Sequence, residues 1–143
     1  MMRKAVLLFI LFGVCALFNS CGLDDDDQNF HFTTLAIIDA TVPDSFDLNE
    51  TYTIEVTYLR PNGCTFFEGF DFAKPAETDR DIVAIGSVLT EDTACTQAVE
   101  EVVATFEFNV IFTEDYHFRF FSGTDENDNS TYLEYTIPVN VPN

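Results

Sequence analysis

The sequence has few basic residues and no tryptophan, and the shortage of positive charge limits what the protein can bind. Its 143 residues contain 6 lysines and arginines against 25 aspartates and glutamates, which gives a formal net charge of -19. A chain without a basic patch cannot neutralise phosphates, so nucleic-acid binding and electrostatic attraction to anionic lipids are excluded. Such acidity often signals disorder, but 16 phenylalanines and 5 tyrosines are too many aromatic residues for a solvated chain. The composition therefore predicts a folded acidic protein, and its length fits one domain.

Long apolar runs are also scarce, and the clear one lies at the amino terminus. Arg3 and Lys4 precede a continuous apolar run over residues 5–18. As a helix this run would span about 21 Å, which is short of the roughly 30 Å core of a bilayer. Basic residues followed by a short apolar segment are typical of a cleaved secretory signal peptide. We therefore expect residues 1–20 to be a signal peptide; an uncleaved membrane helix is the alternative.

The four residues Phe18-Asn19-Ser20-Cys21 follow this run and resemble the lipobox of bacterial lipoproteins. In that family the cysteine becomes the acylated first residue of the mature chain, and Ser20 matches the small residue before the cleavage site. The resemblance implies a lipid anchor on Cys21. Several acyl chains, each CH₂ contributing about 0.8 kcal/mol on burial, make such attachment effectively permanent.

A short acidic run follows the cysteine, as Gly22-Leu23 and then four aspartates at residues 24–27. Gly22 differs from the aspartate that retains some lipoproteins at the inner membrane, and the acidic run resembles the surface-export signal of Bacteroidota lipoproteins. The resemblance implies a lipoprotein of the outer membrane that faces the cell exterior; a solvated tether on the periplasmic face is the alternative. We divide the mature chain into a lipidated acidic tether, 21–29, and a domain, 30–143.

Within the domain, apolar and polar residues alternate with the period of half-buried strands. The alternation is clearest over residues 102–112, and over residues 116–121 it places Tyr116, Phe118 and Phe120 inward. We assign the alternating phenylalanines to the core, in preference to a ligand site, and we expect a bulge near Gly69. The predicted strands are 30–39, 51–59, 64–72, 81–89, 102–112, 116–121 and 131–141. Seven short strands separated by turn residues predict an all-β protein, with one seven-stranded antiparallel immunoglobulin-like β-sandwich. This resemblance is architectural, since the buried tryptophan and the cysteine spacing of antibody domains are absent.

The sequence has 4 cysteines, and two of them are predicted to pair. Cys15 leaves with the signal peptide and Cys21 carries lipid, so Cys64 and Cys95 remain in an exported protein, where disulfides persist. If the strands alternate in direction, both cysteines lie at the end where the amino terminus enters, and the connection between the last two predicted strands lies at that end as well. Two cysteines without a histidine nearby provide too few ligands for a metal ion, so we predict a disulfide and no metal site.

Other candidate sites are weaker. Residues 125–129 (DENDN) superficially resemble a calcium loop, but Ser130 and Thr136 stand where the glycine and the glutamate of that loop belong, so a polar hairpin is preferred. His31 and His117 lack a further metal ligand at suitable spacing. The serines have no recognisable base partner, and carboxylates are too numerous to indicate a catalytic pair.

A tripeptide at residues 92–94 (DTA) resembles the O-glycosylation acceptor of Bacteroidota, and this resemblance implies that Thr93 is a candidate for modification. We predict no catalytic residue and no cofactor. The leading hypothesis is a lipid-anchored, non-enzymatic binding or structural module with a protein or glycan partner; a small envelope hydrolase or accessory subunit using loop carboxylates is the alternative. The alternating strand directions place residues 43–49, 74–80 and 113–115 at the end away from the disulfide, and we predict that a partner meets this distal end or an exposed sheet face.

Overall fold

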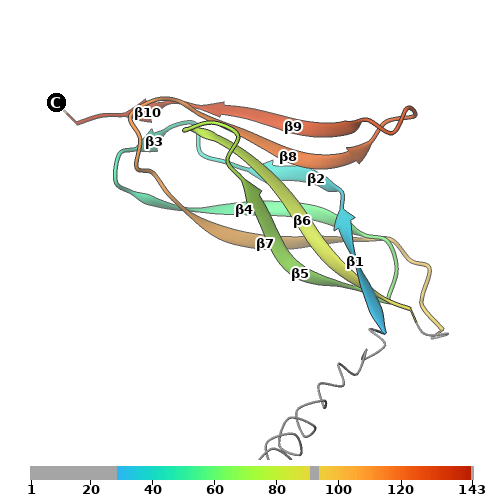
Figure 1. Cartoon of the computed structure of the whole chain (residues 1–143). Coiled ribbons are helices and arrows are strands. Elements are labelled where there is room, and N and C mark those ends of the chain that lie inside the picture. Colours follow the sequence, from blue (N-terminus) through green and yellow to red (C-terminus); the bar gives the residue numbers. More distant parts are fainter. Residues whose placement is uncertain (1–28, 91–93, 143) are drawn as a thin grey trace, which may run out of the picture.

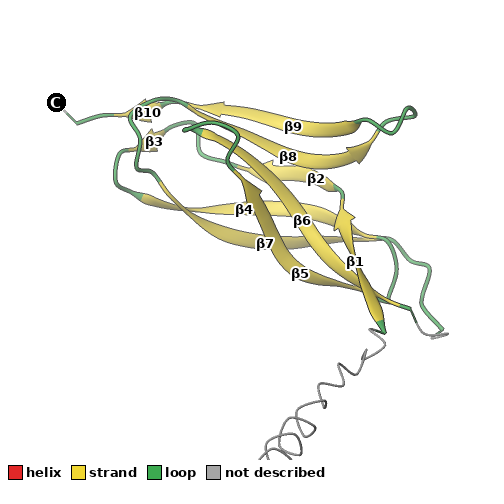
Figure 2. Cartoon of the chain, in the orientation of Figure 1, coloured by secondary structure: helices red, strands yellow, loops and turns green. Residues whose placement is uncertain are grey.

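The computed structural model describes residues 29–90 and 94–142, which form two layers of β-sheet (Figure 1). Over these ranges the chain consists of strands and loops, as Figure 2 shows. The strands are β1 (Phe30–Leu35), β2 (Ile37–Thr41), β3 (Phe46–Asp47), β4 (Thr51–Arg60), β5 (Thr65–Ala73), β6 (Asp79–Leu89), β7 (Glu100–Asn109), β8 (Tyr116–Thr124), β9 (Ser130–Ile137) and β10 (Val139–Asn140). The prediction of an all-β protein is confirmed. No helix in the described ranges has the length and apolar character needed to cross a membrane.

One layer is a five-stranded sheet arranged around β6. β5 pairs with β6 along one side. Along the other side, β1 pairs with residues 84–89 of β6 and β8 pairs with residues 79–82, and β9 follows β8. The second layer contains β2, β4 and β7 in that order, and β3 and β10 form a separate short pair. β5 and β7 are therefore edge strands of different layers, and Figure 1 shows them on the same side of the molecule.

The first predicted strand is divided between the two layers. Its first part, β1, pairs with β6, and its second part, β2, pairs with β4. Leu35 and Ile37, on either side of the change at Ala36, are both buried. The chain therefore keeps its apolar side chains in the core while its backbone leaves one sheet and enters the other.

Two details of the predicted sandwich are wrong. The sheets are not antiparallel throughout, because β6 runs parallel to β8 and β3 runs parallel to β10. The described chain has ten strands where seven were predicted, because the first and last predicted strands are each divided and β3 is added. In an immunoglobulin domain the third strand lies beside the sixth; here the fourth predicted strand, β6, lies beside the sixth, β8.

The bulge predicted near Gly69 is present. The register between β5 and β6 shifts between Phe67 and Gly69, and Gly69 has a φ of 142°. Such a backbone conformation is unfavourable for residues with a side chain, so glycine suits this position. The bulge keeps Phe67 and Phe70 on the core side, where their rings lie 5.1 Å apart.

The core lies between the two layers and is dominated by aromatic rings. Phe46 is fully buried, and its ring centroid lies 4.9 Å from that of Tyr52, 5.5 Å from Phe108 and 6.0 Å from Phe118. Aromatic pairs at such separations stabilise a fold by about 0.5–1.5 kcal/mol beyond the burial of their surface. The predicted inward residues of β8 are buried, namely Tyr116, Phe118 and Phe120. Phe118 and Phe120 therefore belong to the core.

Tyr116 holds the connection between β7 and β8. Its ring is fully buried, and the backbone N–H groups of Ile111 and Phe112 both donate to its hydroxyl oxygen at 3.1 Å. A tyrosine at the start of the sixth strand whose hydroxyl binds backbone a few residues upstream is also found in immunoglobulin-type sandwiches. The hydroxyl satisfies two backbone donors that would otherwise lack a partner in this turn.

Candidate functional site

The strands run along the molecule, so the loops gather at two ends (Figure 1). The amino-terminal end contains the start of β1 together with the β4–β5 and β6–β7 connections. The distal end contains the connections over residues 42–50, 74–78 and 110–115. The expectation from alternating strand directions is therefore confirmed for the β4–β5 and β6–β7 connections. The hairpin between β8 and β9 lies apart from the β4–β5 and β6–β7 connections. In Figure 1 it is at the upper right, and those two connections are at the lower right.

The two cysteines predicted to pair, Cys64 and Cys95, form a disulfide at the amino-terminal end, with Cα atoms 5.4 Å apart. The backbone N–H of Gly63 donates to the carbonyl of Thr96 at 2.9 Å, and a Cβ atom on Gly63 would collide with the Thr96 hydroxyl. Glycine therefore suits the close approach of these two loops, because a side chain at position 63 would force the Thr96 hydroxyl to move. The side-chain oxygen of Asn62 accepts hydrogen bonds from the N–H of Cys64 and the hydroxyl of Thr65, which fixes the turn before β5.

We predict that a thiol reagent labels neither Cys64 nor Cys95 in denatured, unreduced protein and labels both after reduction. The bridge joins residues 31 positions apart, and a loop of that size contributes about 3–4 kcal/mol to stability in the chain-entropy model. Mass spectrometry of peptides containing each cysteine measures the outcome. Labelling before reduction would contradict the disulfide.

An apolar patch lies beside the disulfide, on the outer face of the five-stranded sheet. We call it the amino-terminal patch and define it by Phe30, Phe32, Phe66 and Leu89, whose exposed fractions are 37%, 64%, 47% and 37%. Phe30 lies opposite Leu89, and Phe32 and Phe66 both lie opposite Ser87 on its two sides. Paired residues share a sheet face, so the four side chains are contiguous across β1, β6 and β5.

A groove opens between the edge strands β5 and β7, toward the distal end. This distal groove has a volume of about 220 Å³ and is lined by Phe72, Arg80, Phe106, Glu107, Phe108 and Phe118. Phe72 is 49% exposed, and its ring centroid lies 5.0 Å from that of Phe106. The groove thus combines half-exposed rings with a cation and a carboxylate.

The two cations of the distal half lie over aromatic rings. The guanidinium carbon of Arg80 is 5.7 Å from the ring centroid of Phe108 and 5.3 Å from that of Tyr116, and Lys74 Nζ is 4.7 Å from that of Phe112. Arg80 Nη1 also donates to the carbonyls of Glu77 and Asp79. These contacts hold the guanidinium at the groove without a carboxylate partner among the described residues.

The other two basic residues of the domain are paired with carboxylates. Arg60 forms a salt bridge with Glu100, and Arg119 holds Asp81 through two hydrogen bonds, from Nε at 2.7 Å and from Nη2 at 2.5 Å. The hydrogen bond with Asp81 raises the pKa of the Arg119 guanidinium above its usual value. These pairs link neighbouring strands, β4 to β7 and β6 to β8, so their role is structural.

A second, wider cavity of about 550 Å³ lies between β3 and the carboxyl-terminal segment. Its carboxylate Asp47 accepts hydrogen bonds from the amide of Asn140 at 3.0 Å and the hydroxyl of Tyr52 at 3.4 Å. These bonds join β3 to β10 and β4. Because the carboxylate oxygens are already used to connect strands, Asp47 has the surroundings of a structural residue, and we place the candidate binding site in the distal groove.

The structure favours the polar hairpin over a calcium loop at residues 125–129. The Asp125 carboxylate accepts hydrogen bonds from the backbone N–H groups of Asn127 and Asn129 and from the Asn129 amide. The hydrogen bonds from Asn129 and Asn127 lower the pKa of Asp125. This carboxylate therefore closes its own hairpin.

The two histidines singled out in the sequence lie on different strands, His31 on β1 and His117 on β8. The described ranges contain no group of three histidine, cysteine or acidic side chains suited to hold a metal ion. His31 is exposed on β1, and His117 Nδ1 lies 3.0 Å from the Thr136 hydroxyl. The Ser87 hydroxyl donates to Glu68 at the amino-terminal patch. Cys21 and Thr93 lie outside the described residues.

Comparison with protein-family models, curated proteins and solved structures gave no match. The distal groove was missed by sequence reasoning, which assigned Phe106, Phe108 and Phe118 to the core. The available signal was the small number of basic residues, two of which fall in one predicted connection of residues 74–80.

Proposed function

We propose that the protein is a lipid-anchored, non-enzymatic binding module of the bacterial outer membrane, facing the cell exterior. The signal peptide and the lipobox-like residues before Cys21 support the anchor and the location. The fold is a β-sandwich related in architecture to immunoglobulin-like domains. It shares with them a tyrosine, Tyr116, whose hydroxyl binds the backbone upstream, and it differs from them in the parallel pairing of β6 with β8.

The observation that carries the binding role is the distal groove. Aromatic residues and arginine are enriched among the residues that dominate binding energy at interfaces, especially where they are held rigid. Here Phe72 is half exposed, and Arg80 is fixed by two backbone carbonyls beside it. Such a site suits a protein or glycan that presents an apolar face next to a carboxylate or hydroxyl group.

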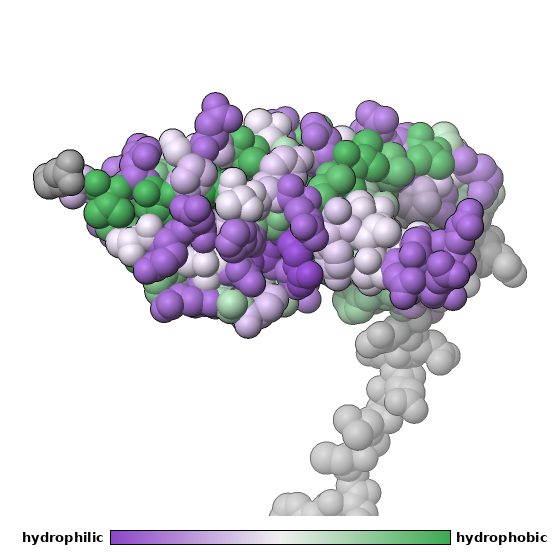
Figure 3. All heavy atoms as spheres, turned by 90° about the horizontal axis from the view of Figure 1, so that it is seen from above, coloured by the Kyte–Doolittle hydropathy of each residue, from purple (hydrophilic) through white to green (hydrophobic). Residues whose placement is uncertain are grey.

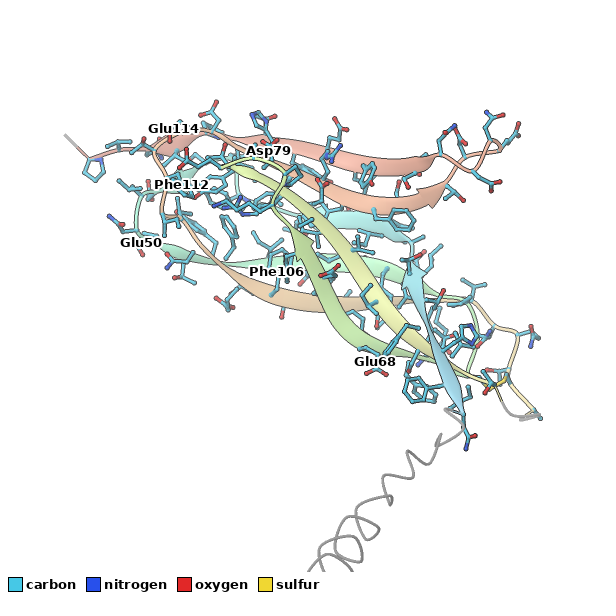
Figure 4. All side chains as sticks on the ribbon, in the orientation of Figure 1. Glu50, Glu68, Asp79, Phe106, Phe112 and Glu114 are labelled. Carbon is cyan, nitrogen blue, oxygen red and sulfur yellow. A yellow bond between two sulfur atoms is a disulfide. The ribbon has the colours of Figure 1, made fainter. Side chains whose placement is uncertain are left out.

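The position of the groove agrees with this role. The anchor would hold the amino-terminal end close to the membrane, which leaves the distal end directed outward. Glu50, Asp79 and Glu114 surround the distal end (Figure 4), so a ligand must tolerate a negative field around the two cations. Viewed from above, hydrophilic side chains cover much of the surface with hydrophobic ones between them (Figure 3), as is usual for a protein surface exposed to water.

We predict that Phe72→Ala weakens partner capture on whole cells by about 30-fold, the effect of removing a residue worth roughly 2 kcal/mol at an interface. Val103→Ala is the matched control, because Val103 is 55% exposed and lies on the outer face of β7. A photo-crosslinking amino acid at Phe72 and, separately, at Asp128 identifies the contact surface. Crosslinking at Asp128 alone, with full capture by Phe72→Ala, would contradict the proposal.

A further inference from the structure

We propose that the amino-terminal patch rests on the lipid surface of the membrane that holds the anchor, with Phe32 and Phe66 at the boundary between headgroups and acyl chains. This inference rests on the proposed lipidation of Cys21. It adds a second contact to the anchor and thereby fixes the orientation of the domain.

The patch has the composition of a membrane-contacting surface. Phe30 and Phe32 are in contact, with ring centroids 5.4 Å apart, and Phe66 extends the apolar surface onto the other side of β6. Contiguous exposed apolar surface of this kind marks interaction sites. Glu68 borders the patch and accepts a hydrogen bond from Ser87. A carboxylate at the edge of such a contact can remain in the hydrated headgroup layer while the rings enter the apolar boundary.

The position of the patch in the chain indicates that lipid covers it. Phe30 follows the proposed anchor Cys21 after the eight residues 22–29, which reach at most about 26–29 Å when fully extended. The patch therefore begins where the tether ends, and it cannot move far from the membrane surface. Phe72, on the same strand as Phe66, lies toward the opposite end of β5.

Charge does not distinguish the two ends. The distal connections and adjoining strand ends carry seven carboxylates against two cations; these carboxylates belong to Asp44, Asp47, Glu50, Glu77, Asp79, Glu114 and Asp115. At the amino-terminal end, Glu100 is paired with Arg60, but the sequence also has Glu91 and Asp92 between β6 and β7 and four aspartates in the tether. Figure 4 shows Glu68 toward this end and Glu50, Asp79 and Glu114 toward the other. The orientation therefore rests on the apolar surface of the patch and on the length of the tether.

Anchoring makes a weak contact sufficient. Four partly exposed apolar side chains bury too little surface to hold a protein on a membrane alone. Once the chain is tethered, contact becomes intramolecular, and the effective concentration of lipid at the patch reaches the millimolar range for short flexible linkers, to order of magnitude. The lipid anchor therefore holds the domain at the membrane, and the patch fixes the orientation of the domain.

The absence of tryptophan permits a direct test. The full-length lipoprotein is produced with either Phe66→Trp or Phe72→Trp and reconstituted into phosphatidylcholine vesicles with brominated acyl chains, which quench nearby tryptophan. The two positions lie on β5 and are 47% and 49% exposed. We expect Phe66→Trp to lose most of its emission and to shift to shorter wavelength, and Phe72→Trp to retain both.

Flotation of the vesicles separates the two proposals. If the protein floats but the two tryptophans are quenched equally, or Phe72→Trp is quenched more, the patch does not rest on lipid and the inference is overturned. Such a result would also be expected if residues 22–28, a second copy or another protein covered the patch. If neither variant floats with the vesicles, the anchor itself is refuted, together with the inference that rests on it.

Discussion

Phe46→Ala is expected to destabilise the domain by about 3–5 kcal/mol, the cost of removing a large buried ring and leaving a cavity. The ring is fully buried and contacts aromatic rings from both layers, among them Tyr52 on β4 and Phe118 on β8. Since small domains are stable by only about 5–15 kcal/mol, this loss removes a large part of the total. Urea unfolding of the purified, oxidised protein, followed by near-ultraviolet circular dichroism of its aromatic residues, measures the effect.

Phe32→Ala is the matched control for this experiment. It makes the same chemical change at a ring that is 64% exposed, and surface substitutions away from special features usually change stability by no more than about 0.5 kcal/mol. Equal shifts of the unfolding midpoint for the two variants would show that Phe46 does not occupy the core.

Phe46 also illustrates where sequence reasoning reached its limit. It stands among Pro43, Asp44 and Asn49, residues that indicate a loop, and no alternation surrounds it. Its backbone is placed by the carboxyl-terminal segment, since Phe46 lies opposite Val139 of β10 and its N–H donates to the carbonyl of Pro138 at 2.9 Å. A pairing between residues that are 92 positions apart in the sequence leaves no local pattern from which it could be predicted.

The long strands could be predicted because their evidence is local. Residues 51–59 and 102–112 alternate without interruption, and β4 and β7 occupy Thr51–Arg60 and Glu100–Asn109. The choice of neighbours is different. β6 and β8 carry the same alternation whether they run parallel or antiparallel, so period alone could not reveal their parallel pairing. The distal groove follows from that arrangement, because strand order makes β5 and β7 edges.

The sequence also predicted at which end of the molecule most loops lie, and this prediction did not require the strand neighbours to be known. Every long strand reverses the direction of the chain, so the number of strands between two loops decides whether they share an end. This holds whichever strands are neighbours. The method therefore placed Cys64 and Cys95 together although the predicted strand pairing was partly wrong. The same count cannot give lateral position, which is why it grouped the β8–β9 hairpin with the disulfide loops.

Cys21→Ala is expected to move the protein almost completely from the membrane to the soluble fraction. The substitution removes the one thiol that the lipobox-like residues present for acylation, and with it chains whose CH₂ groups each contribute about 0.8 kcal/mol of membrane affinity. The amino-terminal patch does not replace the anchor, because its affinity depends on tethering. Fractionation of cells followed by a high-salt wash measures the distribution, since salt removes proteins held only by charge.

Cys15→Ala provides the control, because it changes a cysteine within the predicted signal peptide and leaves Cys21 intact. This variant should remain in the membrane and carry the same lipid mass as the parent protein. If Cys21→Ala stays membrane-bound after the salt wash, residues 5–18 act as an uncleaved membrane segment or another attachment exists. Mass spectrometry separates these cases, since an uncleaved chain retains the mass of residues 1–20.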